Sequence, residues 1–137
     1  VSILYNPGLF PNVLNYTDET TSLDDIIIIN GGIPQDGNIV EHLEAFEEQV
    51  NKEIPDRNND GLIIIDMEQW GITWEQNFNK MLVNHRLSMR RVENKHPDWT
   101  IQDITNLAIK EYNEAAKDFM LKTISYGKIL RPKGKWG

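Results

Sequence analysis

Apolar residues recur at helical spacing in two long stretches of the chain. In the first stretch a capping-box-like pair, Asn38 and Glu41, precedes an apolar stripe, and Pro55 follows it. The stripe consists of Ile39, Leu43, Phe46, Val50 and Ile54. This pattern predicts an amphipathic helix between positions 39 and 54.

A longer helix is predicted in the last third of the chain. Thr100 and Asp103 can begin it, and it is expected to end near Gly127. The apolar side of this helix carries Ile104, Ala108, Tyr112, Ala115 and Phe119. A further helical segment is expected from position 74 to about 92, with the positions of its breaks left open. His96-Pro97 interrupts it, because the residue before a proline disfavours helical backbone angles.

Short apolar runs predict strands. Residues 62–65 are apolar throughout and rich in β-branched side chains, which is typical of a strand buried on both faces of a parallel sheet. Residues 2–5 form a second such run, ended by an Asn-Pro-Gly turn. The polar segment 12–25 is expected to be a surface loop. This order of elements predicts an α/β fold with parallel strands, too short for a complete eight-stranded barrel of about 250 residues.

Composition and charge restrict the class of protein further. Of the 137 residues, 39% are apolar and 26% are charged, which excludes a disordered acidic tail. With 14 basic and 21 acidic side chains the net charge is -7, which argues against nucleic-acid binding. The absence of cysteine excludes disulfides and a thiol nucleophile. Because the chain starts at Val1 without a signal peptide, we expect it to be excised from a longer protein.

Two carboxyl groups are candidates for catalysis. Asp66 and Glu68 follow the apolar run directly, and positions two apart on a strand point to the same face. We therefore expect them side by side at the carboxyl end of a parallel strand, where repulsion raises the pKa of one and suits it to be a general acid. Capping of the following helix explains the pair equally well. Aromatic side chains that could flank a sugar ring are Trp70, Trp74 and Trp99.

Other charged patterns carry weaker signals. The segment 56–61 matches the start of an EF-hand calcium loop, but Met67 occupies the position that requires glutamate, so we expect a polar turn. The three histidines lack a metal-binding spacing, and neither a metal nor a cofactor is predicted. Two basic stretches are expected to be solvated surfaces. They consist of Arg86, Arg90, Arg91 and Lys95, and of Lys128, Arg131, Lys133 and Lys135.

Six motifs in this order resemble the hyaluronidases, glycoside hydrolases that include venom enzymes. They are Tyr5-Asn6-Pro7-Gly8-x-Phe10-Pro11, NGGIPQ from Asn30 with Gly37-Asn38 and His42-Leu43, GLIIIDMEQW from Gly61, His96-Pro97-x-Trp99, Phe119-Met120 with Thr123, and Arg131-Pro132-x-Gly134-x-Trp136-Gly137. The NGGxPQ and IDxExW patterns are the specific ones. The resemblance implies a partial (β/α) TIM-like barrel, from roughly the second strand to the start of a later one, with residues 1–137 as one segment of an incomplete catalytic domain.

The resemblance also implies a reaction. Members of the family cleave the β-1,4 bond between N-acetylglucosamine and glucuronate in hyaluronan with retention, using the acetamido oxygen of the substrate as nucleophile. Glu68 matches the general acid, and Asp66 matches the residue that orients the acetamido nitrogen. Tyr5, Asn6 and Trp70 match substrate-binding positions.

Location and partners follow from the same resemblance. It implies a secreted, monomeric glycoprotein that binds hyaluronan, with chondroitin as an open alternative, and neither nucleic acid nor a membrane. The sequon Asn15-Tyr16-Thr17 makes Asn15 the expected glycosylation site.

Met67 replaces an aromatic residue of the family pattern, and two further positions depart from that pattern. Gly71 stands where an arginine usually follows the tryptophan, and Asn6 stands where venom members often have an aspartate. The departures at Gly71 and Asn6 support a second hypothesis, a hyaluronidase-like protein that binds glycosaminoglycan without cleaving it. The segment by itself is expected to be inactive under both hypotheses.

Overall fold

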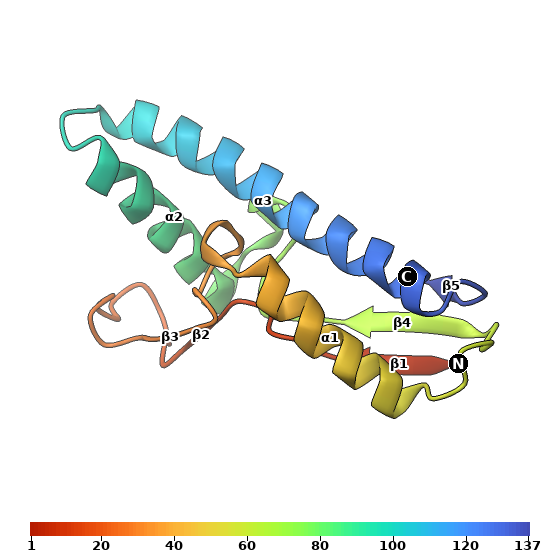
Figure 1. Ribbon diagram of the computed structural model, residues 1–137. Helices are drawn as coiled ribbons and strands as arrows, with labels where there is room; N and C mark the ends of the chain where they lie inside the picture. The colour runs from red at the N-terminus through yellow and green to blue at the C-terminus, as the bar shows by residue number, and fades with distance from the viewer. The chain divides into compact units, whose positions relative to one another are not determined.

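A computed structural model describes residues 1–137 (Figure 1). The strands are β1 (Ser2–Tyr5), β2 (Asn12–Leu14), β3 (Ile27–Ile29), β4 (Leu62–Asp66) and β5 (Lys135–Trp136). The α-helices are α1 (Ile39–Glu53), α2 (Leu82–Lys95) and α3 (Ile101–Leu130). Single 3-10 turns span Pro34–Asp36, Trp74–Gln76 and Asn79–Met81.

The chain divides into two compact units. The first unit comprises residues 1–10, 38–68 and 118–137, and the second comprises residues 11–37 and 69–117. The second unit therefore consists of the two segments that follow β1 and β4 in the chain. The first segment ends just before α1, and the second continues into the first unit along α3. In α/β proteins such segments carry the functional residues.

A parallel three-stranded sheet lies in the first unit. Its order is β1-β4-β5, so β4 is central, and the register places Tyr5 beside Asp66 and Ile63 beside Trp136. The prediction of parallel strands is confirmed. Parallel pairing requires a long crossover between strands, which α1 supplies between β1 and β4.

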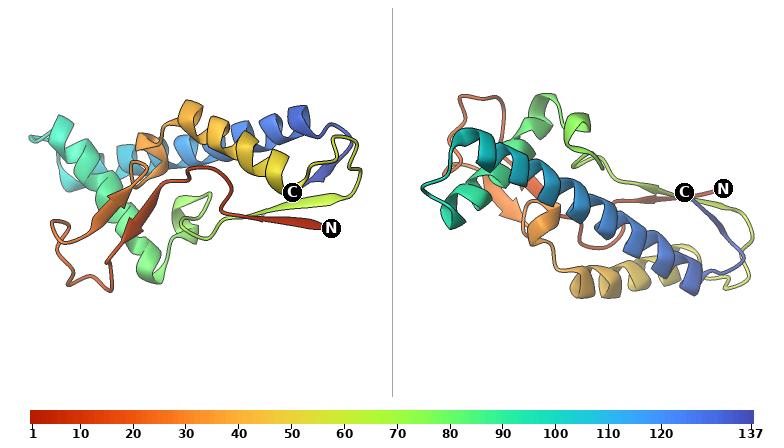
Figure 2. Two further views of the ribbon diagram at one scale, coloured as in Figure 1. Left: turned by 60° about the horizontal axis from the view of Figure 1, so that its bottom comes forward. Right: turned by 90° about the horizontal axis from the view of Figure 1, so that it is seen from above.

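Helices cover one face of this sheet. α1 and the end of α3 lie on the same side of the strands (Figure 2). The buried core there consists of Leu4, Phe46, Val50, Ile54 and Ile63, with Ile65, Tyr126, Leu130 and Trp136 packed against it. Each fully buried side chain of this size stabilises the fold by about 1.5–3 kcal/mol. Because side chains alternate along a strand, Tyr5 and Asp66 belong to the opposite face of the sheet.

The two long amphipathic helices begin where the sequence predicts. Asn38 Oδ1 accepts a hydrogen bond from Glu41 N at 3.1 Å, and Thr100 Oγ1 accepts one from Asp103 N at 3.2 Å. The end of α3 was predicted near Gly127, and the helix continues past this residue to Leu130. A Cβ at position 127 would lie 2.7 Å from the Trp136 ring, so this glycine allows close packing and does not end the helix. No helix combines the length and apolar character needed to cross a membrane.

Two further predictions of local structure were wrong. The helix expected from position 74 begins only at Leu82, because Asn79 has a left-handed φ of 55° that interrupts helical geometry. The segment 12–25 is not entirely a loop, because Asn12–Leu14 pairs antiparallel with Ile27–Ile29. Pairing across more than ten residues depends on the partner strand, which the polar composition of the segment does not reveal.

Arg131 does not lie on a solvated surface as predicted. It is only 2% exposed, and its guanidinium donates hydrogen bonds to the carbonyl oxygens of Ile54 and Leu130 and to Asn51 Oδ1. It thus satisfies carbonyl groups at the carboxyl end of α1 and at the end of α3, which would otherwise be buried without partners.

Candidate active site

The candidate general acid and its neighbour lie at the end of the central strand. Asp66 is the last residue of β4 and is partly buried, whereas Glu68 lies two residues beyond the strand and is exposed. The backbone of Asp66 is fixed from β1, because its carbonyl oxygen accepts a hydrogen bond from Asn6 N at 2.8 Å. The alternation of side chains along β4 fixes the face toward which Asp66 points, but the strand ends at Asp66 and does not fix the direction of Glu68. The side-by-side arrangement of the two carboxyl groups therefore stays a prediction.

Tyr5 and Asn6 occupy the neighbouring strand end. Tyr5 is the register partner of Asp66, so the two side chains share one face of the sheet, and Tyr5 is 65% exposed. Asn6 turns the chain out of β1 with a left-handed φ of 44°, a conformation that asparagine tolerates better than most residues. The structure thus brings Tyr5, Asn6 and Asp66 together at the carboxyl ends of β1 and β4. The Tyr5 phenol is exposed there, and the Asp66 carboxyl group is partly exposed.

Side chains of α1 hold the turn that follows β1. Gln49 accepts a hydrogen bond from Gly8 N at 3.1 Å and donates one to the Tyr5 carbonyl oxygen at 3.4 Å. His42 Nδ1 accepts a hydrogen bond from Leu9 N at 2.9 Å. These supports lie 33 to 44 positions away in the sequence from the backbone groups that they bind, and the sequence motifs did not identify Gln49.

His42 is a structural residue of the first unit. Because Nδ1 accepts from Leu9, the proton is on Nε2, which donates to Thr123 Oγ1 at 2.9 Å, and this hydroxyl in turn donates to the Phe119 carbonyl oxygen at 2.8 Å. The ring is fully buried against Phe10, Phe46 and Phe119. Burial lowers the pKa of His42 to about 4, since the charged form loses its hydration.

The three tryptophans considered as sugar contacts all belong to the second unit. Trp70 is 3% exposed and its Nε1 donates to the Pro11 carbonyl oxygen at 3.2 Å. Trp74 stacks on His85 and Trp99 stacks on His96, each with ring centroids 3.8 Å apart, and Trp99 is 40% exposed. The substrate-binding role of Trp70 stays a prediction.

A buried polar network fixes the segment that follows Glu68. Asn77 Oδ1 accepts hydrogen bonds from Gly71 N and Asn84 Nδ2, both at 3.0 Å, and Asn77 Nδ2 donates to Thr73 O and Tyr112 Oη. Tyr112 Oη donates to the Gly71 carbonyl oxygen at 2.6 Å. Burial raises the pKa of Tyr112, so the phenol stays protonated and donates. Sequence reasoning placed Tyr112 only on an apolar helix face and missed this network, because its members share no local spacing.

Gly71 lies where the backbone packs closely against the next turn. A Cβ at this position would be 2.5 Å from Gln76 Cβ and 3.0 Å from its carbonyl carbon. Gln76 in turn closes the loop by accepting hydrogen bonds from Ile72 N and Thr73 N. In this chain the loop is therefore built around glycine, and an arginine side chain here requires the loop to move.

The structure contains no group of three or more His, Asp or Glu side chains that could hold a metal ion. In the turn at 56–61, Asp56 Oδ1 accepts from Asn58 N at 2.9 Å and Asn59 Oδ1 accepts from Gly61 N at 3.0 Å. Leu62–Asp66 then continues as a strand, as predicted, where a calcium-binding EF-hand would enter a helix.

Comparison with known proteins decides the family. The model of the hyaluronidase family matches residues 8–137 of this chain. The chain belongs to the hyaluronidase family. It is 36% identical over 137 residues to a hyaluronidase of Dolichovespula maculata and 32% identical to one of Apis mellifera.

The fold of this hyaluronidase-family chain matches as well. It superimposes on the crystal structure of bee venom hyaluronidase in complex with a hyaluronic acid tetramer with a TM-score of 0.89 and 33% identity. The match covers 99% of this chain and 40% of the other. The predicted partial (β/α) barrel is confirmed, and the chain spans 40% of the length of the Dolichovespula maculata relative.

Proposed function

We propose that the full-length protein hydrolyses hyaluronan. One observation supports this proposal. Tyr5 and Asp66 are register partners at the carboxyl ends of two adjacent parallel strands, and Glu68 follows Asp66 by two residues. This edge of a parallel sheet is where barrel enzymes bind their substrates. The similarity to a hyaluronidase crystallised with a hyaluronic acid tetramer supports the same substrate for this protein.

The residues of this site suit a substrate-assisted reaction with retention at the β-1,4 bond after N-acetylglucosamine. The acetamido oxygen of that sugar attacks the anomeric carbon while the bond to the leaving oxygen breaks, and Glu68 gives its proton to that oxygen. The Asp66 carboxylate orients the acetamido N–H and stabilises the positive charge that develops there. Glu68 then takes a proton from water as the water attacks the anomeric carbon. The exposed Tyr5 and Asn6 contact the substrate on the neighbouring strand end.

Replacement of the proposed general acid tests this function. In the full-length protein, Glu68→Gln keeps the size of the side chain but cannot donate the proton, so we expect hyaluronan turnover to fall by about 10²–10⁴-fold. Glu48→Gln is the matched control, because Glu48 is an exposed acid on α1. Turnover is measured by the release of reducing ends. Equal activity of both variants and the wild type would remove Glu68 from this role.

Gly71 supports the second candidate, a protein that binds hyaluronan without cleaving it. The family arginine is absent, and the loop is packed around the glycine. Retained binding of hyaluronan by a full-length protein without measurable turnover would favour this candidate over hydrolysis.

We propose further that the protein is secreted and carries a glycan on Asn15. This residue is exposed in the turn after β2, with a left-handed φ of 65°, and Thr17 of its sequon is exposed too. An attached glycan would therefore reach solvent. In protein secreted from insect cells, enzymatic deglycosylation is expected to reduce the mass of the wild type. If Asn15→Gln shows the same reduction, Asn15 is not the glycosylated residue.

A further inference from the structure

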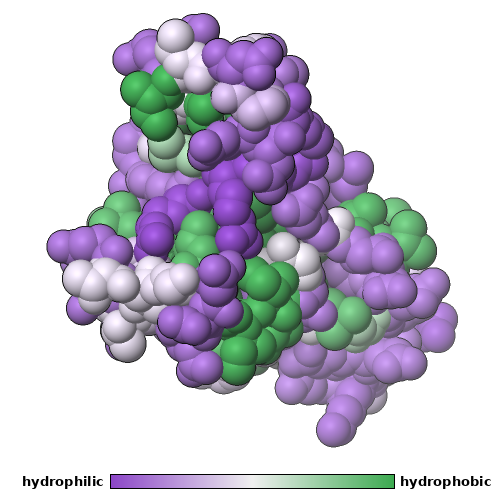
Figure 3. Space-filling view, turned by 90° about the vertical axis from the view of Figure 1, so that its left-hand side faces the viewer, coloured by the Kyte–Doolittle hydropathy of each residue, from purple (hydrophilic) through white to green (hydrophobic).

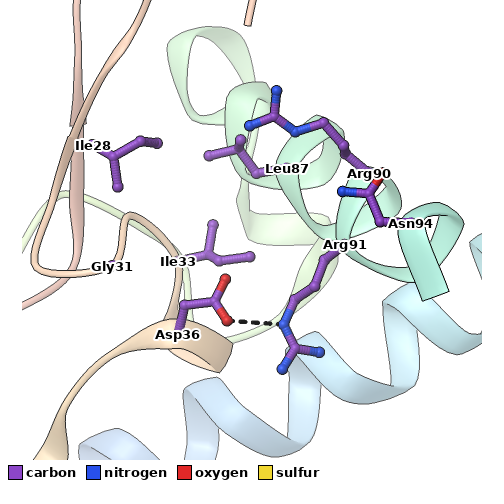
Figure 4. Close-up of a pocket in the computed structure, with 8 residues that line it drawn as sticks. All are labelled: Ile28, Gly31, Ile33, Asp36, Leu87, Arg90, Arg91 and Asn94. Carbon is purple, nitrogen blue, oxygen red and sulfur yellow. Dashed lines mark hydrogen bonds and ion pairs between the residues drawn. The ribbon is translucent and has the colours of Figure 1, made fainter. Parts of the chain in front are cut away.

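A second candidate binding site lies within the second unit, between the segment after β3 and helix α2. It is a cavity of about 270 Å³ (Figure 4). Pockets for drug-sized ligands measure about 300–1,000 Å³, so this slightly smaller cavity suits a single sugar ring, with the next ring of a chain at its rim. On the side of the molecule that carries β2, β3 and α2, Figure 3 shows strongly hydrophilic side chains beside hydrophobic ones.

Two arginines line the cavity, and they differ in their partners. Arg91 Nε forms an ion pair with Asp36 Oδ1 at 2.9 Å, and its Nη1 lies 3.4 Å from Glu111 Oε1. Arg90 is exposed and has no hydrogen bond or ion pair in the structure. Figure 4 shows Arg91 turned toward Asp36 and Arg90 turned the other way. The cavity therefore presents one guanidinium group without a charged partner.

An apolar wall faces this charge. Ile33 and Leu87 are nearly fully buried beneath the cavity, and Ile28 is 46% exposed beside them. The wall is set by the turn at Gly31, whose φ is +89° and where a Cβ would lie 2.1 Å from the Asp36 carbonyl oxygen. Only glycine allows this approach, so Gly31 fixes the conformation of the turn that positions Ile33 and Asp36 at the cavity.

We propose that this cavity binds an acidic, N-acetylated disaccharide unit of a glycosaminoglycan chain. The uronate carboxylate pairs with Arg90, the acetamido methyl group packs on the wall of Ile28, Ile33 and Leu87, and the Asn94 amide binds a hydroxyl or carbonyl group. This inference rests on the proposed function for the choice of polymer.

The charge of the site favours this ligand over more highly charged polymers. Hyaluronan carries one carboxylate per disaccharide, which matches one free guanidinium. A polyphosphate chain would bring several negative charges close to Asp36 on a protein with a net charge of -7.

Such a site would act as a second attachment point for the polymer. A long polymer that is bound at the cavity has a higher effective concentration at the active site. An oligosaccharide that is too short to occupy both sites gains no affinity from the second site. The cavity should therefore lower the KM for long chains.

The test uses the full-length protein and reverses the charge of Arg90. In Arg90→Glu we expect KM for high-molecular-weight hyaluronan to rise about five- to tenfold, with the change confined to KM, and no comparable change for a hyaluronan hexasaccharide. Arg57→Glu is the matched control, because Arg57 is an exposed arginine in the turn before β4. Arg90→Ala, which lacks the added negative charge, serves if Arg90→Glu fails to fold.

A binding measurement separates this inference from the proposed function. In the Glu68→Gln background, calorimetry with a hyaluronan tetrasaccharide should detect a binding event that Arg90→Glu removes. A neutral N-acetylglucosamine tetramer, which lacks the carboxylate, should show no dependence on Arg90. An unchanged KM for the polymer together with Arg90-independent tetrasaccharide binding overturns the inference and leaves the hydrolysis intact. If the wild type does not hydrolyse hyaluronan, the proposed function fails and the binding measurement alone decides the cavity.

Discussion

At the scale of single residues, buried polar side chains of this protein serve the backbone of distant segments. His42 holds the turn after β1 through Leu9 N, and Arg131 caps the end of α1 through the carbonyl of Ile54. Both side chains are buried, so neither is free to touch a substrate. A buried polar group without a hydrogen-bond partner destabilises the fold, so replacement of either member of such a pair should lower the stability.

The buried imidazole of His42 should make the stability of the fold depend on acid. Its pKa is lowered to about 4, below the value of about 6.5 in an unfolded chain. Its contribution is complete above pH 6.5, because only there is the histidine neutral in both states. As the pH falls from 6.5 to 4, the unfolded chain takes up a proton that the native state does not. The free energy of unfolding therefore declines by about 3 kcal/mol over this range.

Urea unfolding of the full-length protein between pH 7 and pH 4 measures this decline. His42→Gln lacks the titrating imidazole, so its free energy of unfolding should depend less steeply on pH in that range than that of the wild type. Parallel curves for the two proteins would show that His42 does not contribute the acid sensitivity.

At the scale of elements, the loop after β4 depends on α3. Tyr112 of α3 reaches the Gly71 carbonyl and Asn77, and Asn113 accepts a hydrogen bond from Trp74 N at 2.8 Å. The helix therefore fixes the segment that directly follows Glu68. The same loop packs Gly71 closely against Gln76. The variant Gly71→Arg would therefore change two things at once, the packing of the loop and the charge beside Trp70.

Removal of a single hydroxyl should loosen this loop. Tyr112→Phe deletes the hydrogen bond to the Gly71 carbonyl oxygen and one of the acceptors of Asn77 Nδ2, which keeps its bond to Thr73 O. The Gly71 carbonyl oxygen then retains only the 3.5 Å bond from Asn77 Nδ2. We expect the free energy of unfolding to fall by about 1–3 kcal/mol. Tyr126→Phe is the control, because Tyr126 Oη bonds only to Glu47 in a partly exposed position and should cost less. Thermal unfolding of both variants provides the measurement, and an equal loss of stability contradicts the proposed role of the network.

At the scale of the whole molecule, the sheet has two strands with an unpaired edge, and for this reason we propose activity for the full-length protein. β1 and β5 are the edge strands, and each has a partner only on its β4 side. Unpaired strand edges favour association with other strands. The chain corresponds to 40% of bee venom hyaluronidase, and Tyr5 and Asp66 belong to the sheet face that the helices leave open.

The sequence by itself determined the elements with a strong local signal. The apolar stripe of α1, its Asn38 cap and the β-branched run of β4 follow from side-chain periodicity and hydrogen bonding within a few residues. The order of the elements predicted a parallel sheet, and the ordered motifs predicted the family; both predictions are confirmed.

Tertiary structure alone decided the rest. The start of α2, the pairing of β2 with β3, the burial of Trp70 and Arg131, and the free guanidinium of Arg90 beside the paired Arg91 depend on residues distant in the chain. Two adjacent arginines look alike in a sequence, because their charge and helix propensity are the same. They differ in the fold because neighbouring helix positions point about 100° apart, so that Arg91 meets Asp36 while Arg90 remains open to a ligand.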